Sequence, residues 1–481
     1  MTARNERPAG DPVSLDTIVA TATPWGRGAL AVVRLSGPDA REIARSVCPG
    51  GPRWIPRRAS LRRAVQADGT LLDEVVATWM PGPRSYTGFD VVELSCHGNP
   101  VVVEALVAAC IARGARPARP GEFTRQAVEN GRLDLVAAES VDALIRARSL
   151  AGARLAAEAA GRIEAVTTRL RERLLDLAAE LEARLDHPGE DLGTWSDEAV
   201  VAALDGIAEE CRGLAASWHE GRVRIEGARV GLIGPVNAGK SSLFNGLVGQ
   251  ERALVSDEPG TTRDVVERAV MLDDLAVTFL DSAGERPAAT ALERAGQALA
   301  ADLLADVELV LLVLAGHRPV GALERGLVDR LGSRPHIVVA THADVVRESA
   351  GDGTGDGAGD GAVAPIPDDE MPEDDPRRRA LWVSNTTGEG IDALRAAIRA
   401  ALVDRPAAAP AAVLVSHRQQ GLMRSIADCC EEARTALTGL AGPAVAAEAL
   451  TRALAALAEL TGEDAREAVL DRMFARFCIG K

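Results

Sequence analysis

The residues with the clearest chemical meaning form a phosphate-binding loop at positions 234–241, with the sequence G-P-V-N-A-G-K-S. They fit the pattern G-x-x-x-x-G-K-[ST], and the loop follows an apolar segment and precedes a helical one, as the motif requires. In such a loop backbone N–H groups surround the phosphates, Lys240 reaches the β- and γ-phosphates, and Ser241 is a ligand of Mg²⁺. We therefore predict a nucleoside-triphosphate site in which Lys240 is catalytic. The nucleotide is also expected to contact Asn237, Ala238, Gly239 and Ser242.

Two further motifs follow in the order expected of GTPase switch regions. The first is T-T-R-D, which begins with Thr261 and Thr262, and the second is D-S-A-G, from Asp281 to Gly284. Asp281 ends a predicted strand, where its carboxylate can hold Mg²⁺ through water, and the Gly284 N–H can meet the γ-phosphate. Either motif alone is also typical of an ordinary loop. In this order after a phosphate-binding loop, they predict a GTPase.

The segment expected to recognise the base departs from the usual pattern. GTPases commonly carry N-K-x-D after a strand, whereas here the strand H-I-V-V-A leads into Thr341-His342-Ala343-Asp344. Asp344 keeps the carboxylate that can accept both N–H donors of guanine. The supporting Asn and Lys are replaced, which predicts a reduced guanine affinity. Ser384, in S-N-T, stands where S-A-K is usual and is expected to contribute to the same site.

Lysine is almost absent from the chain. Only Lys240 and Lys481 occur among 54 basic residues, so the other 52 are Arg. This bias indicates that Lys has been kept where a compact ammonium on a thin stem cannot be replaced by a planar guanidinium. For Lys481, at the end of F-C-I-G-K, a chance survivor is the alternative, because a chain end accepts either residue.

Size and composition indicate a multidomain protein. A chain of 481 residues is too long for one core and predicts about three domains. An apolar fraction of 47% with 3% aromatics favours helices with cores of Ala, Leu and Val. We find no long apolar run, no signal peptide and no disulfide framework among the seven cysteines, and we expect a reduced, cytoplasmic protein with no membrane span. The net charge of −16 argues against a dedicated nucleic-acid binder, although residues 1–133 carry 17 Arg against 13 Asp and Glu.

The pattern of predicted strands and helices changes at several points along the chain, which predicts a multidomain α+β architecture. Residues 1–133 read as an α+β domain with strands at Thr17–Ala22, Leu30–Leu35, Val75–Trp79 and Val91–Ser95. Residues 134–225 have helical periodicity, residues 226–402 alternate strands and helices, and residues 403–481 are helical again. In the third segment, strands at 228–234, 276–281, 308–314, 336–341 and 380–384 predict a parallel P-loop α/β domain inserted into one helical domain.

An acidic segment at 346–379 interrupts the α/β pattern. It contains G-D-G-T-G-D-G-A-G-D-G, followed by an acidic stretch with proline. The ligand spacing of an EF-hand is absent, so a flexible insertion is expected rather than a calcium loop.

Taken together, the motifs resemble the MnmE (TrmE) family of tRNA-modification GTPases over nearly the full length. The resemblance rests on T-I-V-A-T-A-T-P-W-G-R-G, on P-G-P-R-S-Y-T-G-F-D-V-V-E-L-S-C-H-G-N-P and R-P-G-E-F-T-R-Q-A, and on N-A-G-K-S-S, G-T-T-R-D and the terminal F-C-I-G-K. It implies a folate-binding, dimerising N-terminal domain (1–133), a helical domain in two parts (134–225 and 403–481) and an inserted G domain (226–402).

The same resemblance implies an activity, cofactors and partners. A homodimer would join the flavoprotein MnmG in a heterotetramer and add a carboxymethylaminomethyl or aminomethyl group to the wobble uridine of tRNA. The one-carbon unit would come from 5-formyl- or 5,10-methylene-tetrahydrofolate. GTP hydrolysis would need Mg²⁺ and K⁺, and K⁺ would promote dimerisation of the G domains.

Site residues carry over from the family by position. The folate contacts fall on Arg34, Glu93, Arg132 (a lysine in the family) and Lys481. Cys478 would face the folate pocket, although a small buried hydrophobe is the alternative.

The ion and water sites carry over in the same way. Mg²⁺ would be held by Ser241 and Thr262, and K⁺ by Asn237, Ser256, Glu258 and Thr261. The cation would take the place of an arginine finger. The catalytic residue that positions water would be Glu293, in L-E-R-A-G, with Glu285 as a rival directly after D-S-A-G.

Two other functions stay open at this point. An Era-like ribosome-assembly GTPase would need a basic RNA-binding domain, and none is apparent. A folate-dependent one-carbon transferase with a merely structural nucleotide site gains some weight from the altered base motif, but the intact Lys240, Ser241, Thr262 and Asp281 oppose it.

Overall fold

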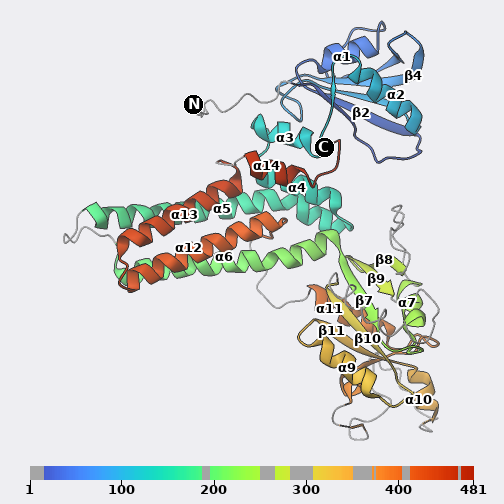
Figure 1. Ribbon diagram of the computed structural model, residues 1–481, viewed down its shortest axis with the longest axis vertical. Helices are drawn as coiled ribbons and strands as arrows, with labels where there is room; N and C mark the ends of the chain where they lie inside the picture. The colour runs from blue at the N-terminus through green and yellow to red at the C-terminus, as the bar shows by residue number, and fades with distance from the viewer. Residues whose placement is uncertain are drawn as a thin grey trace. The chain divides into compact units, whose positions relative to one another are not determined.

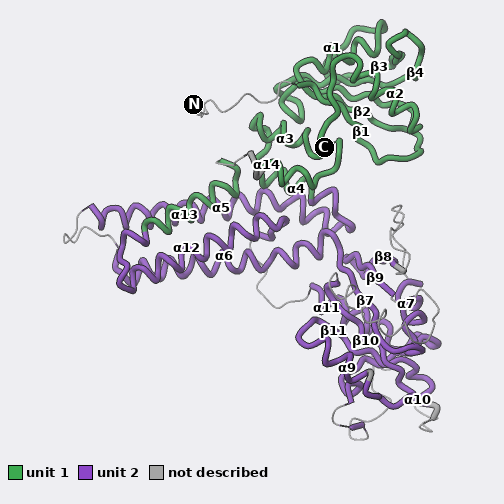
Figure 2. Tube along the Cα trace, viewed as in Figure 1, with its two compact units in different colours: residues 1–142, 447–481 green, residues 143–446 purple. Residues whose placement is uncertain are grey.

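The computed structural model describes residues 16–186, 195–249, 266–281, 307–349, 371–372, 375–403, 412–463 and 467–480. The chain forms two compact units (Figure 2). Unit 1 consists of residues 1–142 and 447–481, and unit 2 of residues 143–446. None of the helices in the described ranges is long and apolar enough to cross a membrane.

Unit 1 contains a six-stranded sheet in the order β3-β4-β5-β2-β1-β6. All neighbours are antiparallel except β1 and β6. The strands are β1 (Ile18–Thr21), β2 (Leu30–Ser36), β3 (Ser60–Val65), β4 (Leu71–Met80), β5 (Val91–His97) and β6 (Arg116–Pro117). Helices α1 (Ala40–Val47) and α2 (Pro100–Ile111) pack against the sheet (Figure 1). The core includes the fully buried Val33, Leu35, Leu94 and Leu106.

The four predicted strands of this sheet are present, but the two-residue β6 and the longer β3 were not predicted. The sequence of β3, S-L-R-R-A-V, does not show the alternation of apolar and polar residues typical of a strand, because two arginines stand at its centre. Arg62 is nevertheless buried, because its guanidinium lies 3.9 Å from the centre of the Trp54 ring and donates hydrogen bonds to the carbonyls of Gly50 and Pro52. A paired and stacked guanidinium can therefore occupy a strand position that faces the core.

The C-terminal residues of unit 1 pack on its helices. The helices here are α3 (Glu122–Glu129), α4 (Leu135–Arg146, shared with unit 2), α13 (Pro443–Thr461, likewise shared) and α14 (Glu467–Phe474). Phe474 and Phe477 form a cluster with Ala138, and their ring centres are 5.1 Å apart. Arg125 of α3 pairs with Asp471 of α14. The end of the chain is thus anchored beside α3.

Unit 2 contains three long helices, α5 (Leu150–Asp186), α6 (Asp197–Glu226) and α12 (His417–Thr438). Helix α6 packs against both of the others (Figure 1). Buried residues recur every three or four positions, for example Leu170, Leu174, Leu177 and Leu181 of α5, which is the spacing of one helix face. Ser196 and Ser416 cap the N-termini of α6 and α12 by accepting backbone N–H groups.

The second sheet of the protein, also in unit 2, has the order β12-β11-β10-β7-β9-β8. The strands are β7 (Ala228–Ile233), β8 (Val266–Leu272), β9 (Leu275–Asp281), β10 (Leu309–Ala315), β11 (His336–Thr341) and β12 (Leu381–Trp382). The helices around it are α7 (Lys240–Val248), α9 (Ala322–Leu331), α10 (Ala343–Ser349), α11 (Ile391–Val403) and the short 3₁₀ helix η2 (Pro376–Arg379). Separate apolar clusters cover the two faces of the sheet.

The sheet differs from the prediction at both edges. The five predicted strands pair in parallel, but β8 was not predicted; it pairs antiparallel with β9 through a tight turn at Asp273 and Asp274. The strand predicted at 380–384 is limited to Leu381–Trp382. An edge strand has one pairing partner, so its sequence signal is weaker than that of the continuous apolar runs in the centre.

The acidic segment predicted over 346–379 is ordered at both of its ends. Residues 346–349 belong to α10, and η2 begins at Pro376. Val346 and Met371 are buried, and Arg377 forms a buried ion pair with Asp375. Residues 350–370 and 373–374 lie outside the described residues.

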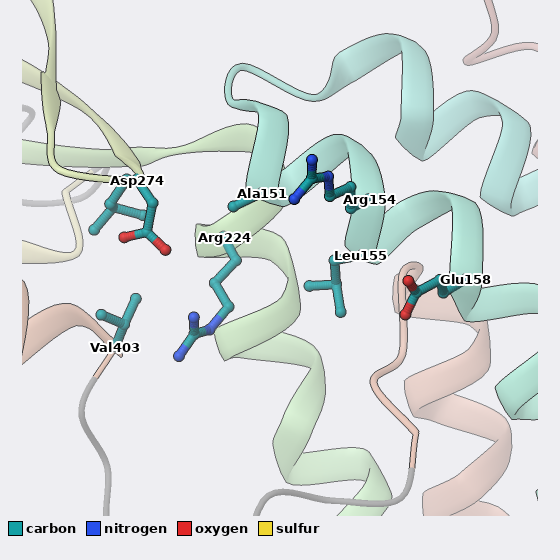
Figure 3. A pocket seen from close by; sticks show the side chains of 8 residues that line it. Ala151, Arg154, Leu155, Glu158, Arg224, Asp274 and Val403 are labelled. Atoms are coloured by element: carbon teal, nitrogen blue, oxygen red, sulfur yellow. The ribbon is translucent and has the colours of Figure 1, made fainter.

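Helix α6 runs directly into β7 through Gly227, whose φ is 84°. A Cβ at this position would lie 2.7 Å from the carbonyl oxygen of Ala276, so only glycine fits. A cavity of about 310 Å³ lies beside this joint (Figure 3). It is lined by apolar and charged side chains of both signs, and the Asp274 carboxylate is turned toward Arg224. The mixed charge does not match the needs of a triphosphate.

Candidate functional site

The phosphate-binding loop connects the end of β7 to the start of α7. Gly234 has a φ of 154°, and a Cβ there would lie 2.1 Å from the carbonyl oxygen of Val313. Gly239 has a φ of 86° and directly precedes α7. Asn237 also lies in the left-handed region, with a φ of 62°. These backbone conformations let the loop wrap around the N-terminus of α7, where backbone N–H groups and the helix dipole favour an anion.

Lys240 is folded back over this loop. Its Nζ atom donates hydrogen bonds to the carbonyl oxygens of Gly234, at 2.9 Å, and of Pro235, at 2.8 Å. Burial lowers the pKa of Lys240, and the nearby Asp281 carboxylate acts in the opposite direction. The ammonium is therefore held over the loop that would receive the phosphates, and phosphate oxygens would restore the charge compensation that burial removes.

Ser241 and Asp281 meet beside the loop. The Ser241 hydroxyl donates to Oδ2 of Asp281 at 3.0 Å, and Asp281 is 5% exposed at the end of β9. Strand β9 lies next to β7, which brings these residues together although they are 40 positions apart. Hydroxyl and carboxylate oxygens are the donors that Mg²⁺ prefers. No group of three or more His, Cys, Asp or Glu side chains suited to a metal occurs within the described ranges.

The base-recognition segment lies at the end of β11. Asp344 is half-buried in the first turn of α10. Ser384 is fully buried after β12, and its hydroxyl accepts the backbone N–H groups of Thr386 and Thr387. Thr341 is fully buried and donates to the carbonyl oxygen of Ala238 in the phosphate-binding loop, at 2.8 Å. This last contact was not predicted from the sequence.

A second group of candidate residues lies in unit 1. Arg34 of β2 and Glu93 of β5 are directly opposite each other in the sheet. Arg34 donates from Nε and Nη2 to Oε1 of Glu93, at 3.0 and 2.8 Å. Its Nη1 donates to the carbonyl oxygen of Gly480 at 3.2 Å. The guanidinium thus links the sheet to the residue that precedes Lys481.

Residues 478–480, the C-terminal tail, are held close to the sheet by backbone contacts. Gly480 has a φ of 94°, and a Cβ there would lie 2.2 Å from the carbonyl oxygen of Thr21. The N–H of Gly121 donates to the carbonyl of Cys478 at 3.3 Å. The Cys478 side chain is exposed, whereas the other six cysteines are buried, so the alternative that it is a buried hydrophobe is wrong.

Arg132 shares no hydrogen-bond partner with Arg34 among the contacts of the described residues. Its Nε donates to the carbonyl oxygen of Ser85 at 3.2 Å. The neighbouring Thr87 belongs to a buried polar network in which the Ser36 hydroxyl lies 2.7 Å from both Thr87 Oγ1 and Gln126 Oε1. Sequence analysis missed this network. The only signal was that Arg34 and Ser36, two positions apart on a strand, share one face.

Several predicted site residues lie outside the described residues. They are Ser256, Glu258, Thr261, Thr262, Gly284, Glu285, Glu293 and Lys481. Their predicted roles in Mg²⁺, K⁺, water and folate binding stay predictions.

Comparisons with known proteins cover nearly the full length of the chain. The family model of the GTP-binding protein TrmE N-terminus matches residues 17–132, and that of the MnmE helical domain matches residues 135–478. The tRNA modification GTPase MnmE of Synechococcus sp. (strain CC9605) is 40% identical over 478 residues, which span 97% of this chain and 100% of that protein. MnmE of Myxococcus xanthus (strain DK1622) is also 40% identical, over 97% of this chain and 99% of that protein.

Among solved structures, the G domain of the T. maritima FeoB iron transporter matches 36% of this chain and 98% of that chain. The identity is 22% and the TM-score is 0.26, which is too low to support an inference about function.

Proposed function

The chain belongs to the MnmE family of tRNA modification GTPases, and from that premise we propose that it modifies C5 of the tRNA wobble uridine. It adds a carboxymethylaminomethyl or aminomethyl group, using a tetrahydrofolate one-carbon unit and a flavoprotein partner, MnmG. It acts as a homodimer that joins the partner in a heterotetramer, in the cytoplasm. The observation that carries the proposal is the hydrogen bond from Arg34 to the Gly480 carbonyl, since it holds the end of the described chain beside Arg34 and Glu93, two of the proposed folate-binding residues.

The residues around Arg34 suit a folate. Folates have carboxylates at one end and a polar pterin with N–H groups at the other, and guanidinium groups pair well with carboxylates. Arg34 is 23% exposed at its side chain, so a ligand can reach it. Glu93 uses Oε1 for both contacts with Arg34, and the described residues leave Oε2 available to accept a pterin N–H. Arg132 and Lys481 would add positive charge for the glutamate tail. A bound 5-formyl- or 5,10-methylene-tetrahydrofolate would supply the one-carbon unit.

The residues of the nucleotide site suit GTP with Mg²⁺. Ser241 and Thr262 would bind Mg²⁺, and Asp281 would hold it through water, consistent with the 3.0 Å contact between Ser241 and Asp281. A bound Mg²⁺ would offset charge on the phosphates. Lys240 would leave the two loop carbonyls and bind the β- and γ-phosphates. Asp344 and Ser384 would hold the guanine, and the Gly284 N–H would contact the γ-phosphate.

A K⁺ site fits the phosphate-binding loop. The Asn237 side chain is exposed, and among the described residues nothing competes for its amide oxygen. Together with Ser256, Glu258 and Thr261 it would bind K⁺, which supplies positive charge where other GTPases use an arginine finger. Glu293 would orient the attacking water. Dimerisation of the G domains would then be coupled to K⁺ binding.

Turnover in different salts and with different nucleotides tests the GTPase part of the proposal. GTP hydrolysis by the full chain should be faster in K⁺ than in Na⁺ of equal concentration, and ATP should not be a substrate. Asn237→Ala should lose the difference between the two cations while its affinity for GTP stays near that of the parent, because backbone N–H groups bind the phosphates. Identical turnover of the parent in K⁺ and Na⁺ would rule the cation mechanism out.

Reconstitution tests the modification part. The chain, the flavoprotein, tRNA, GTP, methylenetetrahydrofolate and an amine should together produce modified uridine that mass spectrometry detects after digestion of the tRNA. The folate supplies the methylene joined to C5 in place of its proton, and the amine supplies the nitrogen: glycine for the carboxymethylaminomethyl group and ammonium for the aminomethyl group. Omission of either the folate or the flavoprotein should prevent the product. An Era-like ribosome-assembly role predicts instead that the chain binds ribosomal RNA and leaves tRNA unmodified.

A further inference from the structure

Thr341 lies where three segments of the nucleotide site meet. Its hydroxyl is 2.8 Å from the carbonyl oxygen of Ala238, 3.2 Å from that of Leu314, and 2.8 Å from Nδ1 of His342. Ala238 belongs to the phosphate-binding loop and Leu314 to β10. Because Thr341 is fully buried, its hydroxyl takes its hydrogen-bond partners inside the protein rather than from bulk water. One hydroxyl therefore connects β11, β10 and the loop that would hold the phosphates.

The protons at this point can be assigned from the hydrogen bonds. A hydroxyl has one proton and can accept further hydrogen bonds, whereas carbonyl oxygens only accept. The Thr341 proton must point toward the two carbonyls, so Nδ1 of His342 must be the donor to Oγ1. In the neutral imidazole this fixes the tautomer, with Nε2 unprotonated.

His342 packs as an uncharged ring against the same loop. Its backbone is left-handed, with a φ of 61°, and its ring centre lies 4.5 Å from that of His317. Its Cε1 atom is 3.4 Å from the position that a Cβ on Gly239 would occupy. The pKa of His342 is lowered by burial and then by His317 and Arg318, while Asp344 acts to raise it. A neutral ring thus stands at the sequence position where the common motif has lysine.

We propose that Thr341 and His342 together replace the Asn and Lys of the common guanine motif, with Thr341 fixing Asp344 relative to the phosphate-binding loop. The inference rests on the proposed function, in which Asp344 binds guanine. Asp344 follows Thr341 by three residues, and the two intervening positions are also held, since His342 bonds to Thr341 and the Ala343 N–H donates to the Val383 carbonyl. Base and phosphates are then bound at a fixed separation, which gives the chain guanine selectivity without N-K-x-D.

If Thr341 positions Asp344, loss of its hydroxyl should weaken the binding of GTP more than the binding of a phosphate chain without a base. A variant without the hydroxyl leaves the carbonyls of Ala238 and Leu314 and the His342 N–H without their partner. We expect the Kd for GTP to rise about tenfold. The Kd for inorganic tripolyphosphate, which has no base to place, should change less than twofold, because the backbone that cradles it is intact.

The test compares Thr341→Val and Thr341→Ala, which lack the hydroxyl, with the matched control Thr341→Ser, which keeps it. Calorimetry on the full chain gives the Kd for GTP, xanthosine triphosphate and tripolyphosphate. Thr341→Ser should bind GTP within about twofold of the parent, and both apolar variants should bind it about tenfold more weakly. In the background Asp344→Ala, the added loss from Thr341→Val should disappear, since the two residues act on the same contact.

The possible failures can be told apart. If the parent binds GTP and xanthosine triphosphate equally, the guanine-binding role of Asp344 is wrong and the proposed function fails at this site. If the parent prefers GTP but Thr341→Val matches it, Thr341 does not position Asp344. If tripolyphosphate binding falls as much as GTP binding, or the loss persists in Asp344→Ala, the hydroxyl supports the loop fold alone and the inference is overturned. Thr341→Ala allows the same comparison if Thr341→Val does not fold.

Discussion

The two candidate sites of the molecule are assembled in different ways. In unit 2, the phosphate-binding part of the nucleotide site is a strand, a loop and a helix in direct sequence, and Lys240 bonds to carbonyls five and six residues before it. In unit 1, Arg34 has partners 59 and 446 residues away. The phosphate-binding loop is therefore a local structure, and the more distant Asp281 and Thr341 join it from neighbouring strands. The site around Arg34 depends on a distant tail that must dock correctly, so a change at the chain end should affect one site and leave the other unchanged.

Deletion of Cys478–Lys481 should have the largest effect and should separate the two sites. It removes the Gly480 carbonyl that accepts from Arg34, the Cys478 carbonyl that accepts from Gly121, and the Lys481 cation. We expect calorimetry to detect no tetrahydrofolate binding and mass spectrometry to detect no tRNA modification. Basal GTP hydrolysis should be nearly unchanged, because the G domain has its own core.

Lys481→Ala is the matched control for the deletion, since it removes the ammonium but keeps the backbone contacts of Gly480. Weaker but measurable folate binding is expected from this variant. If the truncated protein keeps the folate affinity of the parent, Lys481 is a chance survivor of the bias against lysine, and the tail is not part of a folate site.

Lys240→Ala should have the converse effect. GTP turnover should fall about 100- to 1,000-fold, the range found when one preorganised donor to a developing charge is removed. Folate affinity should not change, since the residue lies in unit 2 and bonds only within its own loop among the contacts described. Steady-state kinetics and calorimetry on the same preparation check both statements. A drop in folate affinity would show that the sites are coupled at equilibrium.

More of the nucleotide site than of the site around Arg34 could be predicted from the sequence, because sequence motifs report local structure and not long-range contacts. Short-range motifs such as G-x-x-x-x-G-K-S specify their backbone locally, and the central strands β7, β9, β10 and β11 are continuous apolar runs. The antiparallel β8 was missed because an edge strand is half-exposed, and β3 because arginines occupy it. The contact between Arg34 and Gly480 joins residues 446 positions apart, so no sequence motif indicates it. Only the family resemblance suggested that Arg34 and the C-terminal residues belong to one site.

The base-recognition segment shows a different limit of sequence analysis. A pattern search sees the loss of Asn and Lys at 341 and 342 and predicts weak guanine binding. The structure has the Thr341 hydroxyl bonded to the phosphate-binding loop, so a smaller side chain makes the connection. The connection to the loop needs a hydrogen-bond donor within reach of the Ala238 carbonyl, and a sequence pattern does not show that distance.

Asp344→Asn should have an intermediate effect and sharpen the comparison within unit 2. The amide cannot accept both guanine N–H donors, and a buried donor without a partner costs about 1–3 kcal/mol, so the Kd for GTP should rise about tenfold or more. Xanthosine triphosphate, whose base offers an acceptor in place of one donor, should become a substrate. Competition kinetics with the two nucleotides measure the change. Equal use of ATP and GTP by the parent would contradict guanine recognition by Asp344.

The smallest expected effect is a pH dependence of local stability that is confined to unit 2. In the folded protein, burial, then His317 and Arg318, lower the pKa of His342, and Asp344 partly offsets this. The unfolded segment therefore binds more protons than the folded one between the two pKa values, and stability rises with pH in that window. The contribution is complete above the ordinary histidine pKa of about 6.5 and is lost as the pH falls through the folded-state pKa.

Amide hydrogen exchange, corrected for the pH dependence of intrinsic rates, measures this stability for each strand separately. Between pH 7.5 and pH 5.5, protection of β11 and β10 should fall in the parent, while protection of β2 in unit 1 should change less. In His342→Gln, which cannot titrate in this range, the fall in β11 should be smaller than in the parent. The change in β11 is measured as the difference between parent and variant, so that carboxylates titrating in both proteins cancel. An equal fall in the two proteins would mean that His342 is not held neutral against the loop, and that the ring does not carry the packing role assigned to it beside Gly239.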